Sequence, residues 1–284
     1  MVMSHATRFG AGDGATSDYE FEFLTCDLGA EGSHREAAGI RGDRTVYETS
    51  VVDGVEAIGG GVSMEVRPDD LDEWVPRILG AGGVVGATVP EFVCNVELSA
   101  ESLLYSGCKV NEAVFSASST QNLQLALDIL GKTESTQAFP SISGTLSVLQ
   151  PYVLHQAVVT VASSARSVDN LEIRIANNLV GDRYFNSQTR SEIPESGLDV
   201  SLSFDNPFSS SDTALYDIAR AGVTGSLVFT NGAYSLTMTF ANLKMPRGKQ
   251  AVGGRNTALD KRLVLNAYRT VAAEAIVIAN DSTP

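Results

Sequence analysis

The densest group of side chains that could do chemistry is an acidic run, "DDLDE", at residues 69–73. Clustered carboxylates can bind a divalent cation or exchange protons as general acid and base. The run lacks the alternating acids, the central glycine and the terminal glutamate of an EF-hand loop. It stands directly before an amphipathic stretch, where Asp69, Asp70 and Asp72 can cap the start of a helix. We therefore interpret the run as helix capping.

Neither the histidines nor the cysteines form a metal-binding pattern. Both sets are scattered along the chain, at His5, His34, His155, Cys26, Cys94 and Cys108. The cysteines have no CxxC spacing, which argues against a zinc site, and their odd number argues against a disulfide framework. They fit a reducing compartment, and we expect neither a metal nor a cofactor.

Motifs of nucleophilic catalysis and phosphate binding are also missing. The sequence contains no GxSxG and no GxxxxGK[ST], and "GAGDG" at residues 10–14 precedes no helical pattern. We interpret these glycines as a flexible linker. A β-rich hydrolase would need a positioned pair of carboxylates or a nucleophile with a base, and no pattern singles one out. We expect a protein without enzymatic activity.

The overall composition indicates a folded, acidic protein. Of 284 residues, 43% are hydrophobic, and 20 Lys and Arg against 34 Asp and Glu give a net charge of −14. Such a charge repels phosphate backbones and anionic membranes, so we expect no tight binding of nucleic acid. The N-terminus has no signal-peptide pattern, and no apolar run approaches the ~20 residues of a membrane span. We expect synthesis in the cytoplasm and no contact with a membrane.

Residues 62–80 predict a strand followed by a helix. Apolar and polar residues alternate over 62–66, as in a strand with one buried face. Over 71–79 the apolar residues recur at helical spacing, and Gly80 provides a stop. Pro76 removes a backbone hydrogen bond within this stretch, so the helix should start late or kink.

The same order recurs in the second half of the chain. Residues 198–204 alternate again, and Leu215, Ile218 and Ala219 form the apolar stripe of a second helix, which Gly222 ends. In both halves a strand and a polar, hairpin-like connection precede the unit, and further strands follow it. The pattern therefore predicts two copies of one β-rich unit, each holding a single helix.

The predicted organisation has five parts. We expect an N-terminal arm at 1–39, a first unit at 40–134, a connecting segment at 135–168, a second unit at 169–275 and a C-terminal tail at 276–284. Gly-rich and Ser-rich pieces surround one expected strand in the arm, and prolines mark the connecting segment.

Three segments carry a resemblance to a known family. They are "GGGVSMEVRPDDLDEWVPRILGA", "GCKVNEAVFSASSTQNLQLALDILGKTE" and "SVDNLEIRIANNLV". In this order the chain resembles the tail tube proteins of long-tailed bacteriophages, from about residue 40 to 278. The resemblance implies a mainly β fold of two β-sandwich or barrel-like units, each with one flanking α-helix. It also implies a structural subunit of the virion tail, made in the host cytoplasm.

The family resemblance further implies assembly of copies into rings that stack into a hollow tube. Head-to-tail interfaces that close give rings, and a chain with two units could build from three copies the ring that single-unit members build from six. We favour this pseudo-hexamer over a ring of six chains. The implied partners are other copies, stacked rings, a tape measure protein, tail terminator and distal tail proteins, and passing double-stranded DNA that is not specifically bound.

Candidate site residues come from the polar connections at 44–60 and 181–197 and from "GIRGDRTVYE" at 39–48. As lumen-facing or inter-ring residues we name Glu48, Asp53, Glu56, Glu192 and Glu195, because an acidic channel repels DNA within a Debye length of ~8–10 Å. As candidates for an inter-subunit salt bridge we name Arg41 and Arg44, for which a solvated turn is an equally good interpretation.

A different class of function is kept as the alternative. A virion-associated β-sandwich adhesin or carbohydrate-binding module would expose clustered aromatic side chains on a binding face. The sequence has one Trp, and its Tyr and Phe residues stand mostly at alternating positions that suit a core. The sequence therefore favours the structural subunit.

Overall fold

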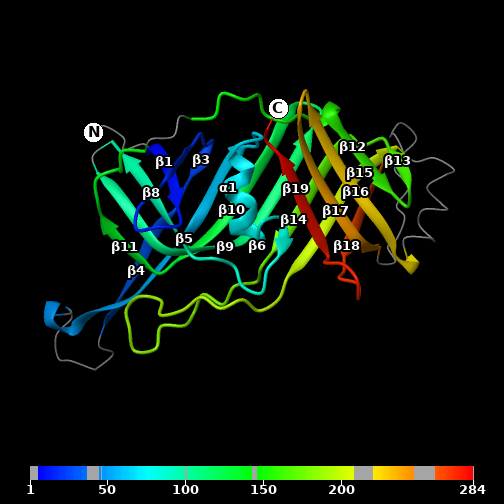
Figure 1. Cartoon of the computed structure of the whole chain (residues 1–284). Coiled ribbons are helices and arrows are strands. Elements are labelled where there is room, and N and C mark those ends of the chain that lie inside the picture. The colour runs from blue at the N-terminus through cyan, green and yellow to red at the C-terminus, as the bar shows by residue number, and fades with distance from the viewer. Residues whose placement is uncertain are drawn as a thin grey trace.

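The computed structural model describes residues 6–36, 45, 47–99, 101–142, 146–207, 220–245 and 260–283. As predicted, the chain is mainly β, and the strand pairs in the described residues are antiparallel (Figure 1). The first half contains β1 (Ala6–Gly12), β2 (Tyr19–Phe21), β3 (Thr25–Cys26), β4 (Gly29–Glu36), η1 (Glu48–Ser50), β5 (Val51–Glu65), α1 (Asp70–Leu79), β6 (Gly80–Ala81), β7 (Val84–Val85), β8 (Phe92–Leu98), β9 (Ser102–Ser118), β10 (Gln121–Gly131) and β11 (Thr133–Thr136). The second half contains η2 (Leu154–Gln156), β12 (Ala157–Val161), β13 (Ser164–Arg166), β14 (Asn170–Ala176), β15 (Asp199–Pro207), β16 (Val223–Asn231), β17 (Tyr234–Lys244), β18 (Asp260–Ala267) and β19 (Ile276–Asp281).

A continuous sheet joins the two halves of the chain. Its strands pair in the order β5–β10–β9–β14–β15–β18. The joint is the pairing of β9 with β14, which runs from Ser118 opposite Asn170 to Glu112 opposite Ala176. The earlier part of the long strand β9 pairs instead with β8 and β11. Thus β9 belongs to the joint at one end and to a second layer of strands at the other.

The order of strand pairing is the same in both halves. In the first half β1 pairs with β2 and β8, β9 pairs with β8, β10 and β11, and β5 pairs with β10 and β4. In the second half β12 pairs with β13 and β16, β17 pairs with β16, β18 and β19, and β15 pairs with β18 and β14. In this scheme β4 corresponds to β14, and β9 corresponds to β17.

The predicted helix is present as α1, which contacts β9 and β19. Gly80 ends it with a φ of 93°, as predicted. The expected late start is wrong, because the helix begins at Asp70 and contains Pro76. The capping interpretation is also wrong for Asp69, whose side chain makes no cap hydrogen bond. Asp69 accepts a hydrogen bond from Ser147, and Asp72 accepts one of 2.7 Å from Asn280.

An aromatic cluster under α1 holds the first strands in the core. Trp74 is fully buried, its ring stacks on Phe9 at 6.3 Å between centroids, and the Phe21 ring lies at 5.0 Å. Phe9 and Phe21 belong to β1 and β2. The flexible-linker interpretation of residues 10–14 is therefore wrong in part, because Gly10 and Gly12 are paired residues of β1. A Cβ on Gly12 would lie 2.6 Å from the carbonyl oxygen of Thr16, so only glycine fits there.

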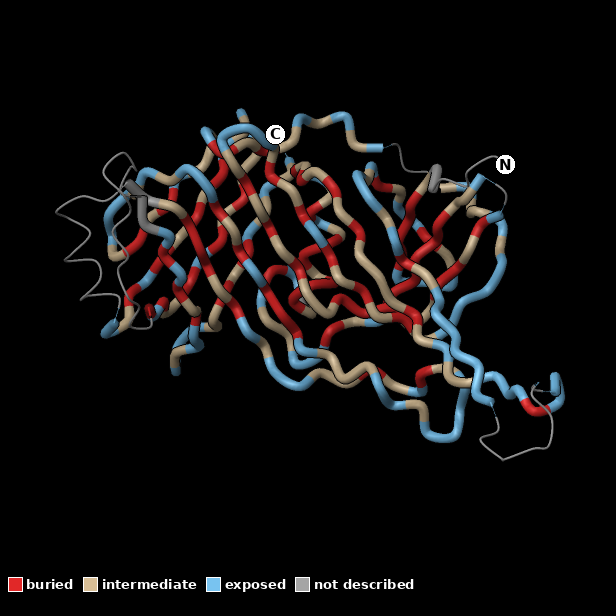
Figure 2. Tube along the Cα trace, turned by 180° about the vertical axis from the view of Figure 1, so that it is seen from behind, coloured by how far each residue is buried: buried red, intermediate tan, exposed pale blue. Residues whose placement is uncertain are grey.

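Two further features bear on the predicted units. Leu215, Ile218 and Ala219 of the second predicted helix lie outside the described residues, whereas residues 220–221 are helical and Gly222 follows with a φ of 108°. The β4–β5 hairpin projects from the rest of the molecule and is largely exposed along β4 (Figure 2). In the described part of the chain, no helix is long and apolar enough to cross a membrane.

Candidate functional site

One face of the sheet β5–β10–β9–β14–β15–β18 carries mostly polar side chains on all six strands. In strand order, one row reads Glu65, Gln124, Ser116, Glu172, Ser203 and Val264. The neighbouring row reads Met64, Leu125, Phe115, Ile173, Leu202 and Leu265, all buried. Because successive side chains point to opposite faces, the second row faces the core and the first does not.

We call the face that carries the first row the polar face. By the strand register it consists of Gly61, Ser63 and Glu65 on β5, Asn122, Gln124, Ala126 and Asp128 on β10, Glu112, Val114, Ser116 and Ser118 on β9, Asn170, Glu172 and Arg174 on β14, Asp199, Ser201, Ser203 and Asp205 on β15, and Arg262, Val264 and Asn266 on β18. None of these residues is aromatic, and most are small. The polar face thus lacks the aromatic platform that a sugar-binding site uses.

Two carboxylates of the polar face are paired with arginine. The Arg174 Nε donates to Glu112 Oε1 at 2.7 Å, and a second guanidinium nitrogen of Arg174 donates to the other oxygen of Glu112. This hydrogen bond raises the pKa of Arg174. Arg262 donates to Glu172 at 3.2 Å and to the Ser203 hydroxyl at 3.1 Å. The first pair links the neighbouring strands β14 and β9, and the second links β18 to β14 across β15.

The other four carboxylates of the polar face accept hydrogen bonds from neutral asparagine amides. The pairs are Asn122 to Glu65 at 2.8 Å, Asn111 to Asp128 at 2.6 Å, Asn170 to Asp205 at 2.8 Å and Asn178 to Asp199 at 2.8 Å. An amide donor fixes a carboxylate without cancelling its charge. The polar face is therefore ordered and net negative.

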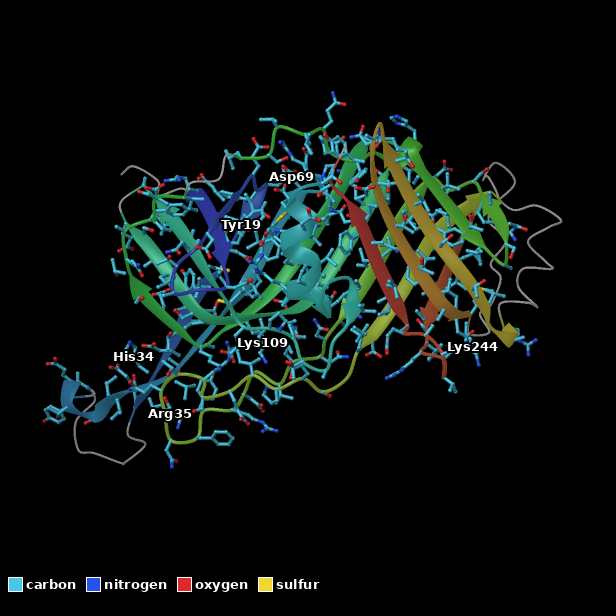
Figure 3. All side chains as sticks on the ribbon, in the orientation of Figure 1. Tyr19, His34, Arg35, Asp69, Lys109 and Lys244 are labelled. Atoms are coloured by element: carbon cyan, nitrogen blue, oxygen red, sulfur yellow. The ribbon has the colours of Figure 1, made fainter. Side chains whose placement is uncertain are left out.

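The predicted acidic residues of the first connection lie on the projecting hairpin, away from the polar face. Glu48 is exposed in η1, and Glu56 is exposed on β5. Asp53 accepts a hydrogen bond of 3.0 Å from the His34 ring, and both side chains are exposed. Figure 3 shows His34 and Arg35 on this hairpin, far from Asp69 at the start of α1.

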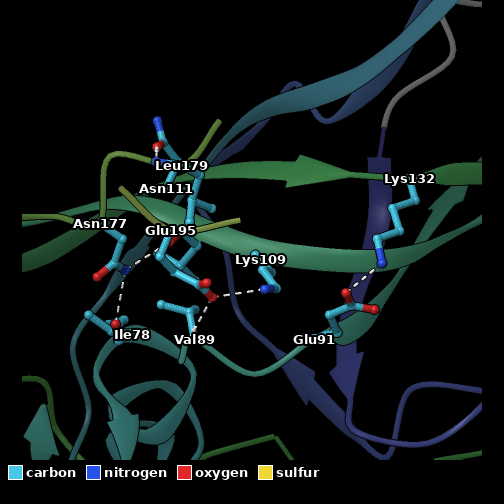
Figure 4. A network of polar contacts seen from close by, with 10 residues as sticks. Ile78, Val89, Glu91, Lys109, Asn111, Lys132, Asn177, Leu179 and Glu195 are labelled. Atoms are coloured by element: carbon cyan, nitrogen blue, oxygen red, sulfur yellow. Dashed lines mark hydrogen bonds and ion pairs between the residues drawn. The ribbon is translucent and has the colours of Figure 1, made fainter. Parts of the chain in front are cut away.

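The two predicted acidic residues of the second connection have partners within the chain. Glu192 forms an ion pair with Arg183 on the exposed loop between β14 and β15. Glu195 accepts hydrogen bonds from Lys109 Nζ at 2.8 Å and from the backbone N–H of Val89 at 2.9 Å (Figure 4). Burial acts to raise the pKa of Glu195, but these hydrogen bonds, with one from its own backbone, outweigh it and leave the pKa lowered.

Other polar contacts around Glu195 hold the end of β14 against the first half of the chain. The Asn177 amide donates to the carbonyl oxygens of Ile78 and Val110 at 3.0 and 2.9 Å, and the Leu179 N–H donates to Asn111 at 2.9 Å (Figure 4). Glu195 therefore contributes to a structural network inside the chain.

The remaining candidates give no chemical site. Arg41 and Arg44 lie outside the described residues. In the parts of the chain that the structure describes, no group of three or more His, Cys, Asp or Glu is arranged to hold a metal ion. The acidic run at 69–73 contacts Ser147, Asn280 and Ser282 instead.

Sequence reasoning named the charged connections and missed the polar face. The signal was the polar half of each alternating strand, such as Ser63 and Glu65 between Val62, Met64 and Val66. Alternation shows that a strand has a polar side, but not that the polar sides of six strands from both halves form one surface. That required the β9–β14 pairing.

Comparison with known proteins assigns the chain to a family. A family model described as "Phage tail tube protein" matches residues 4–270. The chain belongs to the phage tail tube protein family. The predicted resemblance is thereby confirmed, and the match also covers most of the residues that were expected to form an N-terminal arm. A search of curated proteins finds no match to the chain.

Membership of the tail tube family gives the protein a structural role in the virion tail and implies self-assembly into a tube. The confirmed mainly β fold agrees with this role. The alternative of an adhesin or carbohydrate-binding module gains no support, because the matched family is structural and the polar face has no aromatic residue.

Proposed function

We propose that this tail tube protein forms rings that stack into a hollow tube, and that the polar face lines the channel through which the double-stranded genome passes. The observation that carries the proposal is the difference between β14 and β4. Strand β14 lies between β15 and β9, whereas β4 pairs only with β5 among the described residues.

The β9–β14 joint provides a model for the contact between chains. Strand β4 corresponds to β14, and β14 pairs with β9. Because β9 corresponds to β17, we expect the free edge of β4 to pair with the β17–β18 part of a second copy. An exposed edge strand presents unpaired N–H and C=O groups that favour such pairing. In a head-to-tail contact of this kind, each added copy still has one free edge. When the ring is complete, the last free edge pairs with the first copy.

The repeated pairing order supports a ring of three chains. Two units with the same pairings would contribute two equivalent sectors per chain, so three chains would form a pseudo-hexamer, with six chains as the alternative. The pairings include β1–β2 and β12–β13. We therefore propose that each unit extends beyond the predicted ranges 40–134 and 169–275 and takes in one of these hairpins.

The polar face suits a channel that must not retain DNA. Its carboxylates outnumber its two arginines, and the chain carries a net charge of −14. Duplex DNA has one charge per ~1.7 Å, so a negative wall repels it and no base or phosphate is specifically held. A basic wall would bind the backbone and slow its passage.

Stacking contacts are assigned to the projecting hairpin and to the loop between β14 and β15. Glu48, Asp53 and Glu56 on the hairpin, and Glu192 on the loop, are exposed or half-buried and remain our inter-ring candidates. Glu195 is the weakest of the five candidates, since Lys109 already binds it.

We also propose that Arg41 and Arg44 form ion pairs between subunits. The further partners that we propose are tape measure, tail terminator and distal tail proteins, which would bind at the ends of the tube.

The decisive experiment combines electron microscopy of the purified protein with native mass spectrometry of a ring. We expect tubes, and rings with the mass of three chains; a ring of six chains would remove the pseudo-hexamer. If the protein stays a monomer or dimer even when tail initiators are present, the whole proposal is contradicted.

Two proline variants test the β4 edge. Adjacent residues of a strand direct their N–H groups to opposite edges, so Ala30→Pro and Glu31→Pro remove donors from different sides of β4. We expect one variant to disturb the β4–β5 hairpin and the other to keep the far-UV spectrum and melting temperature of the native chain while blocking ring formation. If neither variant loses ring formation while keeping the native fold, β4 is not the joining edge.

A further inference from the structure

Among the polar-face residues named on β5, β10, β9, β14, β15 and β18, the two arginines are the basic ones, and each is held by a glutamate of the same face. Arg174 on β14 binds both oxygens of Glu112 on β9, across the joint between the halves of the chain. Arg262 on β18 binds Glu172 on β14 and the hydroxyl of Ser203, which lies on β15 between them. The donor groups that a phosphate would use are thus directed at carboxylates.

These ion pairs are poorly placed to stabilise the fold. The side chains of Arg174 and Arg262 are 46% and 56% exposed, and ion pairs in such positions contribute only about 0–1 kcal/mol to the stability of a protein. Uncharged side chains could occupy the same positions at little cost. The main consequence of these two ion pairs is therefore that the arginine charges are neutralised on the surface, and their contribution to the stability of the fold is small.

The remaining carboxylates of the face show the opposite arrangement. Glu65, Asp128, Asp199 and Asp205 are bound by asparagine amides, which leave the negative charge intact. The face therefore cancels each positive charge locally and keeps the surplus of negative charge. An unpaired arginine on the same surface would bind phosphate through two parallel N–H groups.

We propose that Glu112 and Glu172 hold the guanidinium groups of Arg174 and Arg262 away from DNA phosphates, so that neither guanidinium group is free to bind passing duplex DNA. This inference rests on the proposed function, since it requires that the polar face be the surface that DNA passes. The partner is double-stranded DNA as a polyanion, without sequence preference. The two glutamates act as positioning residues for their arginines.

The test compares two double variants that change the charge of the same face equally. Glu112→Gln with Glu172→Gln frees both arginines, whereas Asp128→Asn with Asp205→Asn removes two carboxylates that hold no arginine. Binding of a short labelled duplex is measured by fluorescence anisotropy over a series of salt concentrations. We expect the first variant to bind the duplex about tenfold or more tightly than the native protein at low salt, with affinity falling as salt rises, and the second to stay within about twofold of it.

A further variant separates the freed arginines from any other change. Adding Arg174→Gln and Arg262→Gln to the first variant should abolish the gain in DNA binding. Equal affinity of the two double variants for the duplex would mean that net charge alone matters and would overturn the proposal, as would the absence of any gain over the native protein in the first variant. Melting temperatures of all variants establish that they are folded.

Failure of this inference can be told apart from failure of the proposed function. Electron microscopy of the same samples reports whether tubes form, independently of DNA. The duplex assay is performed on assembled tubes and on free subunits, in which the polar face is accessible. Tubes without the expected difference in DNA binding contradict the inference alone, whereas the absence of tubes contradicts the proposed function.

Discussion

Arg190 donates a hydrogen bond to the carbonyl oxygen of Ile58, 132 positions earlier in the chain. The same guanidinium group donates to the carbonyls of Gly131 at 2.9 Å and Gly181 at 2.6 Å, and the side chain is buried. Arg190 belongs to the loop between β14 and β15, whereas Ile58 and Gly131 are paired residues of β5 and β10. One residue of the second half thus fixes its loop on the first.

Loss of this contact should destabilise the chain. We expect Arg190→Ala to lower the free energy of unfolding by about 2–4 kcal/mol, because three carbonyls lose a charged donor and a cavity remains. Arg190→Lys should recover only part, since lysine lacks the planar fork. Denaturant unfolding provides the measurement. The control is Arg183→Ala, an exposed residue of the same loop that pairs with Glu192 and should change stability by about 0.5 kcal/mol or less.

The end of α1 gives a second prediction. Gly80 has a φ of 93°, and a Cβ there would lie 2.2 Å from the carbonyl oxygen of Thr88, whereas Gly82 has a φ of 32° and open space around its Cβ position. Gly80→Ala should cost about 2–4 kcal/mol, and Gly82→Ala about 1 kcal/mol, because only the first adds a steric clash to the strained φ. Equal melting temperatures of the two variants would contradict the argument.

The ion pair of Lys109 and Glu195 predicts a loss of stability in acid. The lowered pKa of Glu195 means that its contribution is present above the pKa of the unfolded chain and is lost as pH falls through the folded value. Lys109→Gln should therefore cost about 1–3 kcal/mol at pH 7 and less below pH 4. Unfolding of Lys109→Gln, Glu195→Gln and the double variant at both pH values isolates the pair; additive effects at pH 7 would argue against it.

Asp70 predicts the opposite dependence on pH. Burial, followed by the nearby charge of Asp69, raises the pKa of Asp70 to about 7, so the folded state holds the proton more tightly than the unfolded chain. The stability that Asp70 contributes is full below about pH 4 and is lost as pH rises through 7. Asp70→Asn should match the native protein at pH 4 and exceed its stability at pH 8 by about 1–2 kcal/mol, since partial exposure and the helix N-terminus weaken the effect.

Thermal unfolding at the two pH values checks the Asp70 prediction. Asp169→Asn, at an exposed position, is the control and should show no such difference. An Asp70→Asn variant that is less stable than the native protein at pH 8 would mean that the ionised carboxylate stabilises the folded state, contrary to the raised pKa.

Local patterns in the sequence predicted the elements whose signals lie within a few residues. The strand around Met64 and the helix ended by Gly80 are examples, because alternation, helical spacing and a glycine stop are all short-range signals. Strand β1 was missed because its glycines are typical of a linker. Gly12 is required there by the close approach of Thr16, which depends on how the chain turns back.

The same limit applies to the candidate site. The sequence indicated which connections are acidic, but Glu195 is bound by Lys109, 86 positions earlier, and no local pattern encodes that pairing. Likewise, Glu112 and Arg174 are 62 positions apart and meet only through the register of β9 and β14.

By itself the sequence determined the strand-rich composition, the acidic charge and the family to which the chain belongs, because alternation, charge and ordered segments can be read along the chain. Only the tertiary structure decided that the two halves share one sheet and that its polar side chains form a continuous surface. The physical reason is that strand pairing joins backbone groups far apart in sequence, and its register sets which side chains meet.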